Sequence, residues 1–268
     1  MHSKKYTYTL LDVGGTFIKR QDGSQVPIAS DGSAEAIAAS LKAAVGSLQD
    51  VLGIGVCIPG PFDYLEGRFL MQHKFAAVYG RLFRELAGIP EGMEVRYGHD
   101  VNVPLGGACS LLGLTRGNTA LVTLGTGLGF SYAVKGEVQC SESGSPTRDL
   151  WNLSYQGGIL EDAISSRGIR STYQALTGDH TQTAYSIAQK AFAGEEAALE
   201  TYSNVGQLLG EVLAPLLAEL DVDTLLMGGQ VSKSLSLMIR PLQNALEGVQ
   251  ISPLPEGAIY AGLRALFD

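Results

Sequence analysis

The chain has 268 residues, 45% of them hydrophobic, and a formal net charge of -8. This length supports one large domain or two modest ones, each with a hydrophobic core. The acidic balance, without a cluster of Lys and Arg, argues against nucleic acid as the main partner, because phosphate backbones require concentrated positive charge.

The sequence predicts a cytoplasmic protein with no membrane partner. Asp12 interrupts the N-terminal apolar run before it reaches the length of a signal-peptide core. The most apolar later stretch, 205–220, carries acidic residues and Pro215, which favours a buried, kinked helix over a membrane span. The three cysteines are far apart and form no CxxC pair, so we expect neither a disulfide framework nor a zinc knuckle.

The first half of the chain predicts strands alternating with helices. Ser33 can cap the first helix, and the continuous apolar run at 51–58 is typical of a central strand buried on both faces. In chain order we expect strands to Val13, at 17–20 and at 25–29, a helix from Ser33 to about Leu48, a strand at 51–58, a hairpin at 63–70, a helix at 81–87, a strand at 94–97 and a helix at 103–112.

The second half begins with the same order of elements. We expect a strand at 118–124, a glycine turn, a hairpin about Lys135 and Gly136, helices from about 160 to 220, a strand at 222–227, a helix at about 232–246 and a final amphipathic helix. No linker or low-complexity segment separates the two halves, so we expect them to pack closely.

The stretch DVGGT at 12–16 stands at the first glycine turn and recurs in altered form as TLGTG at 123–127. Glycine has no Cβ, so such a turn lets backbone N–H groups approach a phosphate closely. The residues after Gly15 predict another strand, which excludes a P-loop and a dinucleotide-binding fingerprint. Taken alone, DVGGT is equally compatible with an ordinary tight hairpin.

A meander followed by alternating helices and strands, present twice with glycine turns at matching points, resembles the actin-like ATPase fold, also called the ribonuclease H-like fold. This α/β resemblance implies an N-terminal lobe of residues 1–115 and a C-terminal lobe of residues 116–268. It also implies nucleotide in an interlobe cleft, and the final helix could pack on the N-terminal lobe.

Five motifs in order resemble the ROK family of bacterial sugar kinases, repressors and related open reading frames. DVGGTFIK and TLGTGLG are similar to the two phosphate motifs of the family. GIGVCIPGPFD resembles the start of its sugar site, GHDVN its NDAN segment, and LLMGGQV its adenosine-side turn. The motifs span residues 12–231.

The chain also departs from the family pattern. The family usually has an ExGH segment and a zinc site built from a histidine and a CxCGxxGCxE run, and neither is intact here. The corresponding region, SPTRDLWNLSYQGGILEDA, contains no cysteine and no histidine. We therefore expect no zinc, and of this region we transfer a sugar-binding role to Glu161 only.

The resemblance implies a catalytic base and a sugar site. Asp100 matches the family's catalytic aspartate and follows a predicted strand, although a solvated loop carboxylate is the alternative. His99 replaces the family's asparagine, which predicts an altered sugar preference. The expected substrate-binding residues are Pro59, Gly60, His99, Asp100, Asn102 and Glu161; Asn102 could equally cap the following helix.

The resemblance also implies an ATP and Mg²⁺ site. Asp12 could hold a water of hydrated Mg²⁺ or cap the turn through the N–H of Gly14 or Gly15. Lys19 could add charge or be solvated. The expected phosphate and nucleotide contacts are Asp12, Gly14, Gly15, Thr16, Lys19, Gly125, Thr126, Gly127, Gly228 and Gly229.

The resemblance therefore implies an ATP-dependent sugar kinase, glucokinase-like, acting by default on the 6-hydroxyl of a hexose or amino sugar. A homodimer is the expected assembly. The alternative is a non-catalytic sugar-binding regulator of the same family, because the ExGH histidine and the zinc ligands are missing. A DNA-binding version is disfavoured because the first phosphate strand is expected to begin near Tyr6, before which no helix-turn-helix domain fits.

Overall fold

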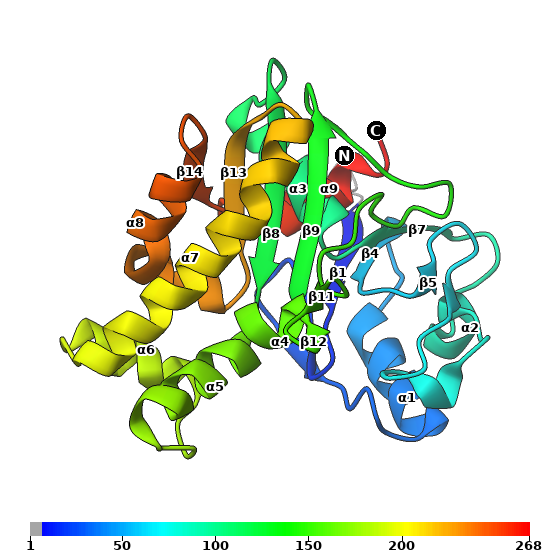
Figure 1. Ribbon diagram of the computed structural model, residues 1–268. Coiled ribbons are helices and arrows are strands. Elements are labelled where there is room, and N and C mark those ends of the chain that lie inside the picture. Colours follow the sequence, from blue (N-terminus) through cyan, green and yellow to red (C-terminus); the bar gives the residue numbers. More distant parts are fainter. Residues whose placement is uncertain (1–6) are drawn as a thin grey trace. The chain divides into compact units, whose positions relative to one another are not determined.

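The computed structural model describes residues 7–268, so the expected start of the first strand at Tyr6 lies outside the described residues (Figure 1). The chain divides into two compact units. Unit 1 contains the described residues up to Leu112 together with Val138–Thr147 and Glu256–Asp268. Unit 2 contains Gly113–Glu137 and Arg148–Pro255.

Unit 1 is built on a five-stranded sheet with the order β3-β2-β1-β4-β7. The first three strands are antiparallel, and β4 and β7 run parallel to β1. The strands are β1 (Thr7–Val13), β2 (Phe17–Arg20), β3 (Gln25–Pro27), β4 (Val51–Ile58) and β7 (Glu94–His99). The remaining elements are α1 (Ala34–Val45), β5 (Phe62–Asp63), β6 (Arg68–Phe69), η1 (Ala76–Val78), α2 (Phe83–Ala87), α3 (Asn102–Leu112) and α9 (Ala258–Ala265).

Unit 2 is built on a second five-stranded sheet with the order β10-β9-β8-β13-β14. Its strands are β8 (Asn118–Leu124), β9 (Leu128–Val134), β10 (Glu137–Val138), β13 (Val222–Gly228) and β14 (Gln250–Pro253). The other elements are β11 (Ser154–Tyr155), β12 (Gly158–Ile159), α4 (Leu160–Ile164), α5 (Ser166–Thr177), α6 (Ala184–Phe192), α7 (Glu196–Glu219), η2 (Val231–Ser234) and α8 (Leu235–Ala245).

The two sheets have the same topology. In each, the third, second and first strands lie side by side as a meander, and the fourth and fifth follow on the other side of the first. The two central connections, β1–β4 and β8–β13, are parallel in both units. The chain therefore has the duplicated α/β arrangement of the actin-like fold.

Most predicted elements are present, with differences at their ends. Ser33 caps α1 as expected, its side chain accepting from the N–H of Ala36. The helix ends at Val45, three residues before the predicted Leu48, because Gly46 adopts a positive φ of 67°. The predicted helix at 232–246 is divided into η2 and α8.

Three short strands are not predicted by the sequence. β11 and β12, of two residues each, pair as a hairpin, and β14 is an edge strand of four residues that ends in Pro253. Strands this short have no readable period of alternation. In the described part of the chain, no helix is both long enough and apolar enough to cross a bilayer.

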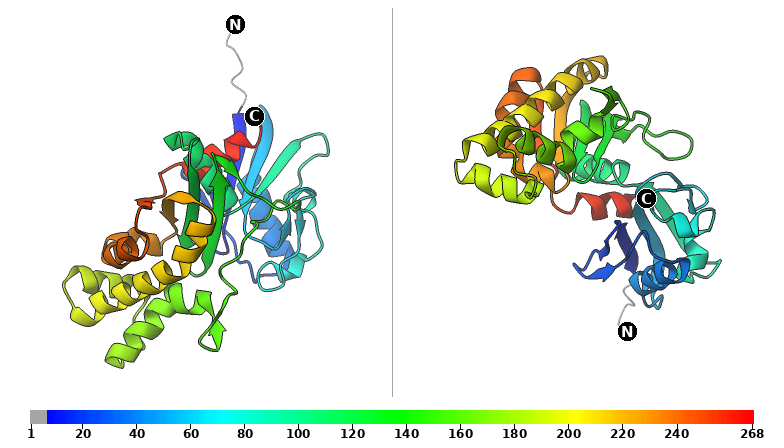
Figure 2. Two further views of the ribbon diagram at one scale, coloured as in Figure 1. Left: turned by 45° about the horizontal axis from the view of Figure 1, so that its top comes forward. Right: turned by 60° about the horizontal axis from the view of Figure 1, so that its bottom comes forward.

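The last helix, α9, belongs to unit 1 and packs on α3 and β1 (Figure 2). Two glycines permit this contact. A Cβ on Gly107 would lie 1.9 Å from the carbonyl oxygen of Ala258, and one on Gly262 would lie 1.9 Å from that of Val103. The backbones of α3 and α9 therefore approach each other more closely than any side chain at these positions would allow.

Candidate functional site

The carboxyl ends of β1, β4 and β7 lie at one edge of the unit 1 sheet. These strands are parallel neighbours, with Asp12 opposite Cys57 and Ile58 opposite His99. Ligand-binding groups of open α/β sheets gather at this edge. The structure thus brings together Asp12, the turn that follows it, the Pro59–Gly60 segment and Asp100.

The DVGGT stretch forms the tight turn between β1 and β2. The N–H of Gly14 donates to the carbonyl of Phe17 at 3.0 Å, so the backbone closes the turn and Asp12 does not cap it through Gly14. The N–H groups of Gly15 and Thr16 have no hydrogen-bond partner among the described residues. These two groups, with the exposed hydroxyl of Thr16, remain as donors for a phosphate.

Asp12 is a largely buried carboxylate held by Lys19. Its side chain is 16% exposed, and its Oδ2 lies 3.3 Å from Nζ of Lys19 on the facing strand. Burial raises the pKa of Asp12 above its ordinary value, the Lys19 ammonium lowers it, and the charge of Asp100 raises it further. The pKa of the neighbouring Cys57 thiol is also raised, by burial first and then by Asp12 and Asp100.

Asp100 follows the last residue of β7 and is 43% exposed. Its Oδ1 lies 3.0 Å from Nδ1 of His99, which in turn accepts a hydrogen bond from the N–H of Val101 at 3.2 Å. Nδ1 serves one of these contacts at a time: with a proton it donates to Asp100, and without one it accepts from Val101. The His99 ring is thereby fixed beside the carboxylate.

His99 also forms part of a small cluster with Gly60 and Tyr64. The His99 and Tyr64 rings lie 5.6 Å apart, and a Cβ on Gly60 would lie 3.3 Å from Nε2 of His99 and 3.4 Å from the Tyr64 hydroxyl. The Tyr64 hydroxyl donates to the carbonyl of Ile58 at 3.1 Å. Its pKa is raised, chiefly by burial. Tyr64 was absent from the sequence-based site, and only its place four residues after Gly60 could have suggested it.

Asn102 is the first residue of α3 and anchors a loop that comes from much later in the chain. Its Nδ2 donates to the carbonyl of Gly144 at 3.1 Å and to Sγ of Cys140 at 3.2 Å. We name residues 138–147 the serine loop, because its members Ser141, Ser143 and Ser145 hydrogen-bond to one another. This loop belongs to unit 1 and lies next to Asn102, whereas its place in the sequence predicts the C-terminal lobe.

In unit 2, two glycine turns meet at the carboxyl edge of the parallel pair β8 and β13. Gly228 lies opposite Thr123, and Gly229 has a φ of 87°. A Cβ on Gly229 would lie only 2.2 Å from the carbonyl oxygen of Leu124. The N–H of Gly125 donates to the carbonyl of Gly127 at 3.0 Å, which closes the turn at 125–127 that we call the second phosphate turn because of the binding expected from its sequence. The exposed Thr126 occupies its tip.

Glu161 lies in α4 of unit 2 and supports the second phosphate turn. Its Oε2 accepts from the N–H of Leu128 at 3.0 Å, and its Oε1 lies 2.6 Å from the Arg167 guanidinium. A Cβ on Gly127 would lie 2.8 Å from Oε2 of Glu161. Both carboxylate oxygens of the residue expected to hold sugar therefore have protein partners.

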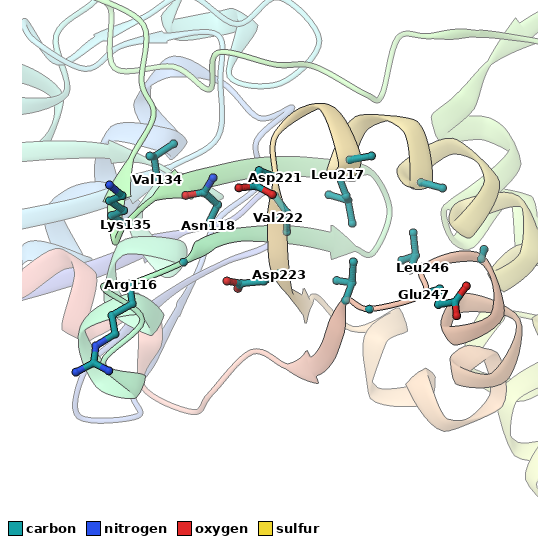
Figure 3. A pocket seen from close by; sticks show the side chains of 16 residues that line it. Arg116, Asn118, Val134, Lys135, Leu217, Asp221, Val222, Asp223, Leu246 and Glu247 are labelled. Atoms are coloured by element: carbon teal, nitrogen blue, oxygen red, sulfur yellow. The ribbon is translucent and has the colours of Figure 1, made fainter.

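A cavity of about 600 Å³ lies elsewhere in unit 2 (Figure 3). Its lining includes Asn118 and Val222, which begin β8 and β13, and Leu217 near the end of α7. It is thus at the amino ends of the strands whose carboxyl ends carry the glycine turns. None of the residues predicted for the site lines it.

Comparison with known proteins identifies the relatives of this chain. Residues 154–259 match the model of the ROK family, a range that includes Glu161 and the Gly228–Gly229 turn. This part of the chain is therefore similar to the ROK family. This confirms the resemblance drawn from the five motifs.

Individual relatives extend over nearly the whole chain. A glucokinase from Halalkalibacterium halodurans is 22% identical, with 94% of this chain and 89% of the relative covered. A ROK family glucokinase from Streptomyces griseus, solved with glucose and AMPPNP, is 20% identical with a TM-score of 0.75, covering 96% of this chain and 97% of the other.

A ROK family transcriptional regulator, a homologue of the E. coli MLC protein, is also similar. It is 17% identical with a TM-score of 0.78, and the match covers 97% of this chain and 77% of the regulator. These structural likenesses establish the actin-like fold for this chain, and the similar proteins include both an enzyme and a regulator.

The described residues offer one carboxylate suited to hydrated Mg²⁺. Asp12 stands at the end of β1 beside the free N–H groups of the first phosphate turn, and Mg²⁺ prefers one or two carboxylates together with phosphate oxygens. Within residues 7–268, no three or more His, Cys, Asp or Glu side chains are grouped closely enough to hold a metal by themselves.

Proposed function

We propose that this ROK protein is an ATP-dependent sugar kinase that phosphorylates a hydroxyl of a hexose or amino sugar, by default the 6-hydroxyl. The observation that carries the proposal is the position of Asp100, directly after β7 on the sheet edge that also holds Asp12 and the first phosphate turn. A base and a phosphate turn on one edge are what phosphoryl transfer to an alcohol requires. The similarity to the Halalkalibacterium halodurans glucokinase supports it.

In the proposed reaction, the Asp100 carboxylate accepts the proton of the sugar hydroxyl while the hydroxyl oxygen attacks the γ-phosphorus. The bond from the γ-phosphorus to the β–γ bridging oxygen breaks, and ADP leaves with the electron pair. His99, 3.0 Å from Asp100, would orient the carboxylate. Pro59 and Gly60 would line the sugar site.

Asp12 would hold a water of Mg²⁺ bound to ATP. The bound ion would neutralise charge on the β- and γ-phosphates. Gly15 and Thr16 would donate to phosphate oxygens, while Gly14 and Lys19 maintain the turn and the Asp12 side chain through the contacts described above.

The glycine turns of unit 2 would also contact nucleotide. We propose Gly125, Thr126 and Gly127 as phosphate-side contacts and Gly228 and Gly229 as adenosine-side contacts. Among the proposed substrate-binding residues, Asn102 would anchor the serine loop. Glu161 would have to give up its bond to Arg167 or to the N–H of Leu128 before it could bind a sugar hydroxyl.

The test is a phosphorylation screen with magnesium-ATP over glucose, mannose, fructose and their N-acetylamino forms, followed by coupled detection of ADP. We expect sugar-dependent ADP release with at least one member. Sugar-independent ATP consumption, or none with any sugar, would contradict the kinase proposal.

A second candidate is a sugar-binding regulator without catalysis. The paired state of Glu161 favours it, because a carboxylate already bonded to Arg167 and Leu128 is less available to a sugar hydroxyl. The similarity to a ROK transcriptional regulator also supports it. Titration calorimetry with the same sugars separates the two: sugar binding without ATP consumption favours the regulator.

We further propose a homodimer that works in the cytoplasm. The dimer follows from the family resemblance, and no disulfide joins Cys57, Cys109 or Cys140 in the described structure, which agrees with a reducing compartment. Light scattering after size-exclusion chromatography measures the mass directly. A single species at the monomer mass of 28.3 kDa would contradict the dimer.

A further inference from the structure

Lys74 lies across the first phosphate turn, although it is 58 positions away from Thr16 in the chain. A Cβ on Gly15 would lie 4.0 Å from both Cδ and Cε of Lys74, and 3.3 Å from Oγ of Ser30. The aliphatic stem of Lys74 therefore passes over the face of Gly15, where the turn has no side chain of its own.

Backbone hydrogen bonds fix this arrangement. Ser30 donates its N–H to the carbonyl of Gly15 at 3.1 Å and accepts from the N–H of Phe75 at 2.6 Å, so it connects the turn to the residue after Lys74. Phe75 is fully buried against Phe69 and has a φ of 54°, a backbone conformation that a non-glycine residue adopts only when its surroundings impose it. Lys74 is thus presented by an ordered segment.

The charge of Lys74 is not used within the described structure. No ion pair or hydrogen bond of its ammonium group is found among residues 7–268, and the side chain is half-buried. Lys19, for which the sequence left open an added charge at this turn or a solvated side chain, lies 3.3 Å from Asp12. The turn therefore combines two free N–H groups, at Gly15 and Thr16, with one unpaired ammonium group close by.

We propose that Lys74 is a phosphate-binding residue of this site, contacting an oxygen of the β- or γ-phosphate when nucleotide binds to the first phosphate turn. This rests on the proposed function. An ammonium group on a flexible stem is a point charge suited to phosphate oxygens. The contribution of the Lys74 charge to nucleotide affinity should therefore increase with the number of phosphates and should not depend on the base or the ribose.

A lysine stem that packs over a glycine is not by itself evidence of phosphate binding. Lys42 provides a control for this packing. Lys42 on α1 covers Gly88 in the same manner, with Cε and Cδ 3.8 and 3.9 Å from the position of a Cβ on that glycine. Gly88 is the C-cap of α2, where its N–H already donates to carbonyls of that helix. Lys42 therefore has the same packing role without a phosphate turn beneath it.

The test is titration calorimetry of AMPPNP, ADP and AMP against the wild type, Lys74→Met, Lys74→Arg and the control Lys42→Met. Met preserves the stem and removes the charge. Loss of one charge-assisted contact predicts about 10- to 100-fold weaker AMPPNP binding by Lys74→Met, a smaller loss with Arg, and little change for AMP. Lys42→Met should bind all three as the wild type does.

Two outcomes would overturn the proposal, and they are distinguishable. Unchanged AMPPNP affinity in a folded Lys74→Met variant would assign Lys74 to packing over Gly15 and leave the kinase function standing. Absence of AMPPNP and ADP binding by the wild type would remove the proposed function, and the role of Lys74 with it. If Lys74→Met unfolds, the ratio of AMPPNP to AMP affinity in Lys74→Arg is compared with that of the wild type. A lower ratio supports the phosphate contact, and an unchanged ratio contradicts it.

Discussion

Asp12 and Lys19 face each other across the first hairpin, with Nζ of the lysine 3.3 Å from Oδ2 of the aspartate. The pair is unequal, since the lysine side chain is 46% exposed and the aspartate side chain 16%. Burial raises the pKa of Asp12 more than the exposed lysine lowers it. The charged form of Asp12 therefore destabilises the fold at neutral pH. Such a cost is expected of a carboxylate whose role is to bind a ligand.

We predict that Asp12→Asn raises the thermal stability of the protein at pH 7. A carboxyl whose pKa is raised on folding contributes stability below its unfolded pKa, near 3.8, and loses that contribution as the pH rises through the folded-state pKa. The gain from Asn should therefore be full at pH 7 and decrease toward pH 4. Scanning calorimetry between pH 4 and pH 8 measures it.

The exposed Asp31 provides the matched control, because Asp31→Asn removes the same charge without relieving a buried one. A lower Tm for Asp12→Asn at pH 7 would contradict the prediction and would mean that the bond to Lys19 outweighs burial. The same variant should lose activity, because Asn is a poorer partner for the water of a bound Mg²⁺.

Asp100→Asn should lower kcat by about 10²- to 10⁴-fold, because an amide cannot accept the hydroxyl proton. Sugar and nucleotide affinity should change little, since the amide is nearly the same size and remains beside His99. Single-turnover kinetics and calorimetry on the active sugar give the two measurements. Turnover equal to the wild type would exclude Asp100 as the base.

Replacement of His99 should alter sugar selectivity more than turnover. His99→Asn removes the ring that contacts Tyr64 and the position above Gly60, and it introduces an amide with different donors and acceptors. We expect the ranking of kcat/KM among the sugars to change, mainly through KM. The decisive measurement is that ranking. An unchanged ranking would contradict a role of His99 in sugar selection and leave only its proposed orientation of Asp100.

Much of the fold is local in origin, and the sequence could therefore predict it. The apolar run at 51–58 matches β4 at both ends, and Ser33 caps α1 as its position predicts. The short strands β11, β12 and β14 could not be predicted, because each is defined by a neighbouring strand rather than by its own pattern.

The candidate site likewise contains residues that local sequence suggests and contacts that only tertiary packing creates. Asp12, Gly15 and Asp100 could be proposed from the sequence because each lies at or just after the end of a strand with a readable pattern. Gly144 reaches Asn102 across 42 residues, and Lys74 reaches Gly15 through Ser30, so both contacts depend on tertiary packing. The pairing of Glu161 with Arg167 likewise required the geometry of α4 and α5.

Gly228 and Gly229 of unit 2 should differ in their tolerance of a side chain. Gly229→Ala should destabilise unit 2 by more than about 2 kcal/mol, because its φ of 87° is strained for a residue with a Cβ and that atom would lie 2.2 Å from the Leu124 carbonyl oxygen. Gly228→Ala should cost less. Its Cβ would lie 3.2 Å from Cδ2 of Leu254, a side-chain atom that can move.

Urea denaturation followed by circular dichroism measures both variants, and nucleotide titration at a urea concentration where both remain folded measures the site. Because β13 and β8 carry the two glycine turns in contact, the backbone shift forced at Gly229 should weaken ADP binding together with stability, whereas Gly228→Ala should retain more of both. Equal losses of stability in the two variants would contradict the steric argument. A stable Gly229→Ala variant would show that the turn can move away from Leu124, in which case the close contact does not define its shape.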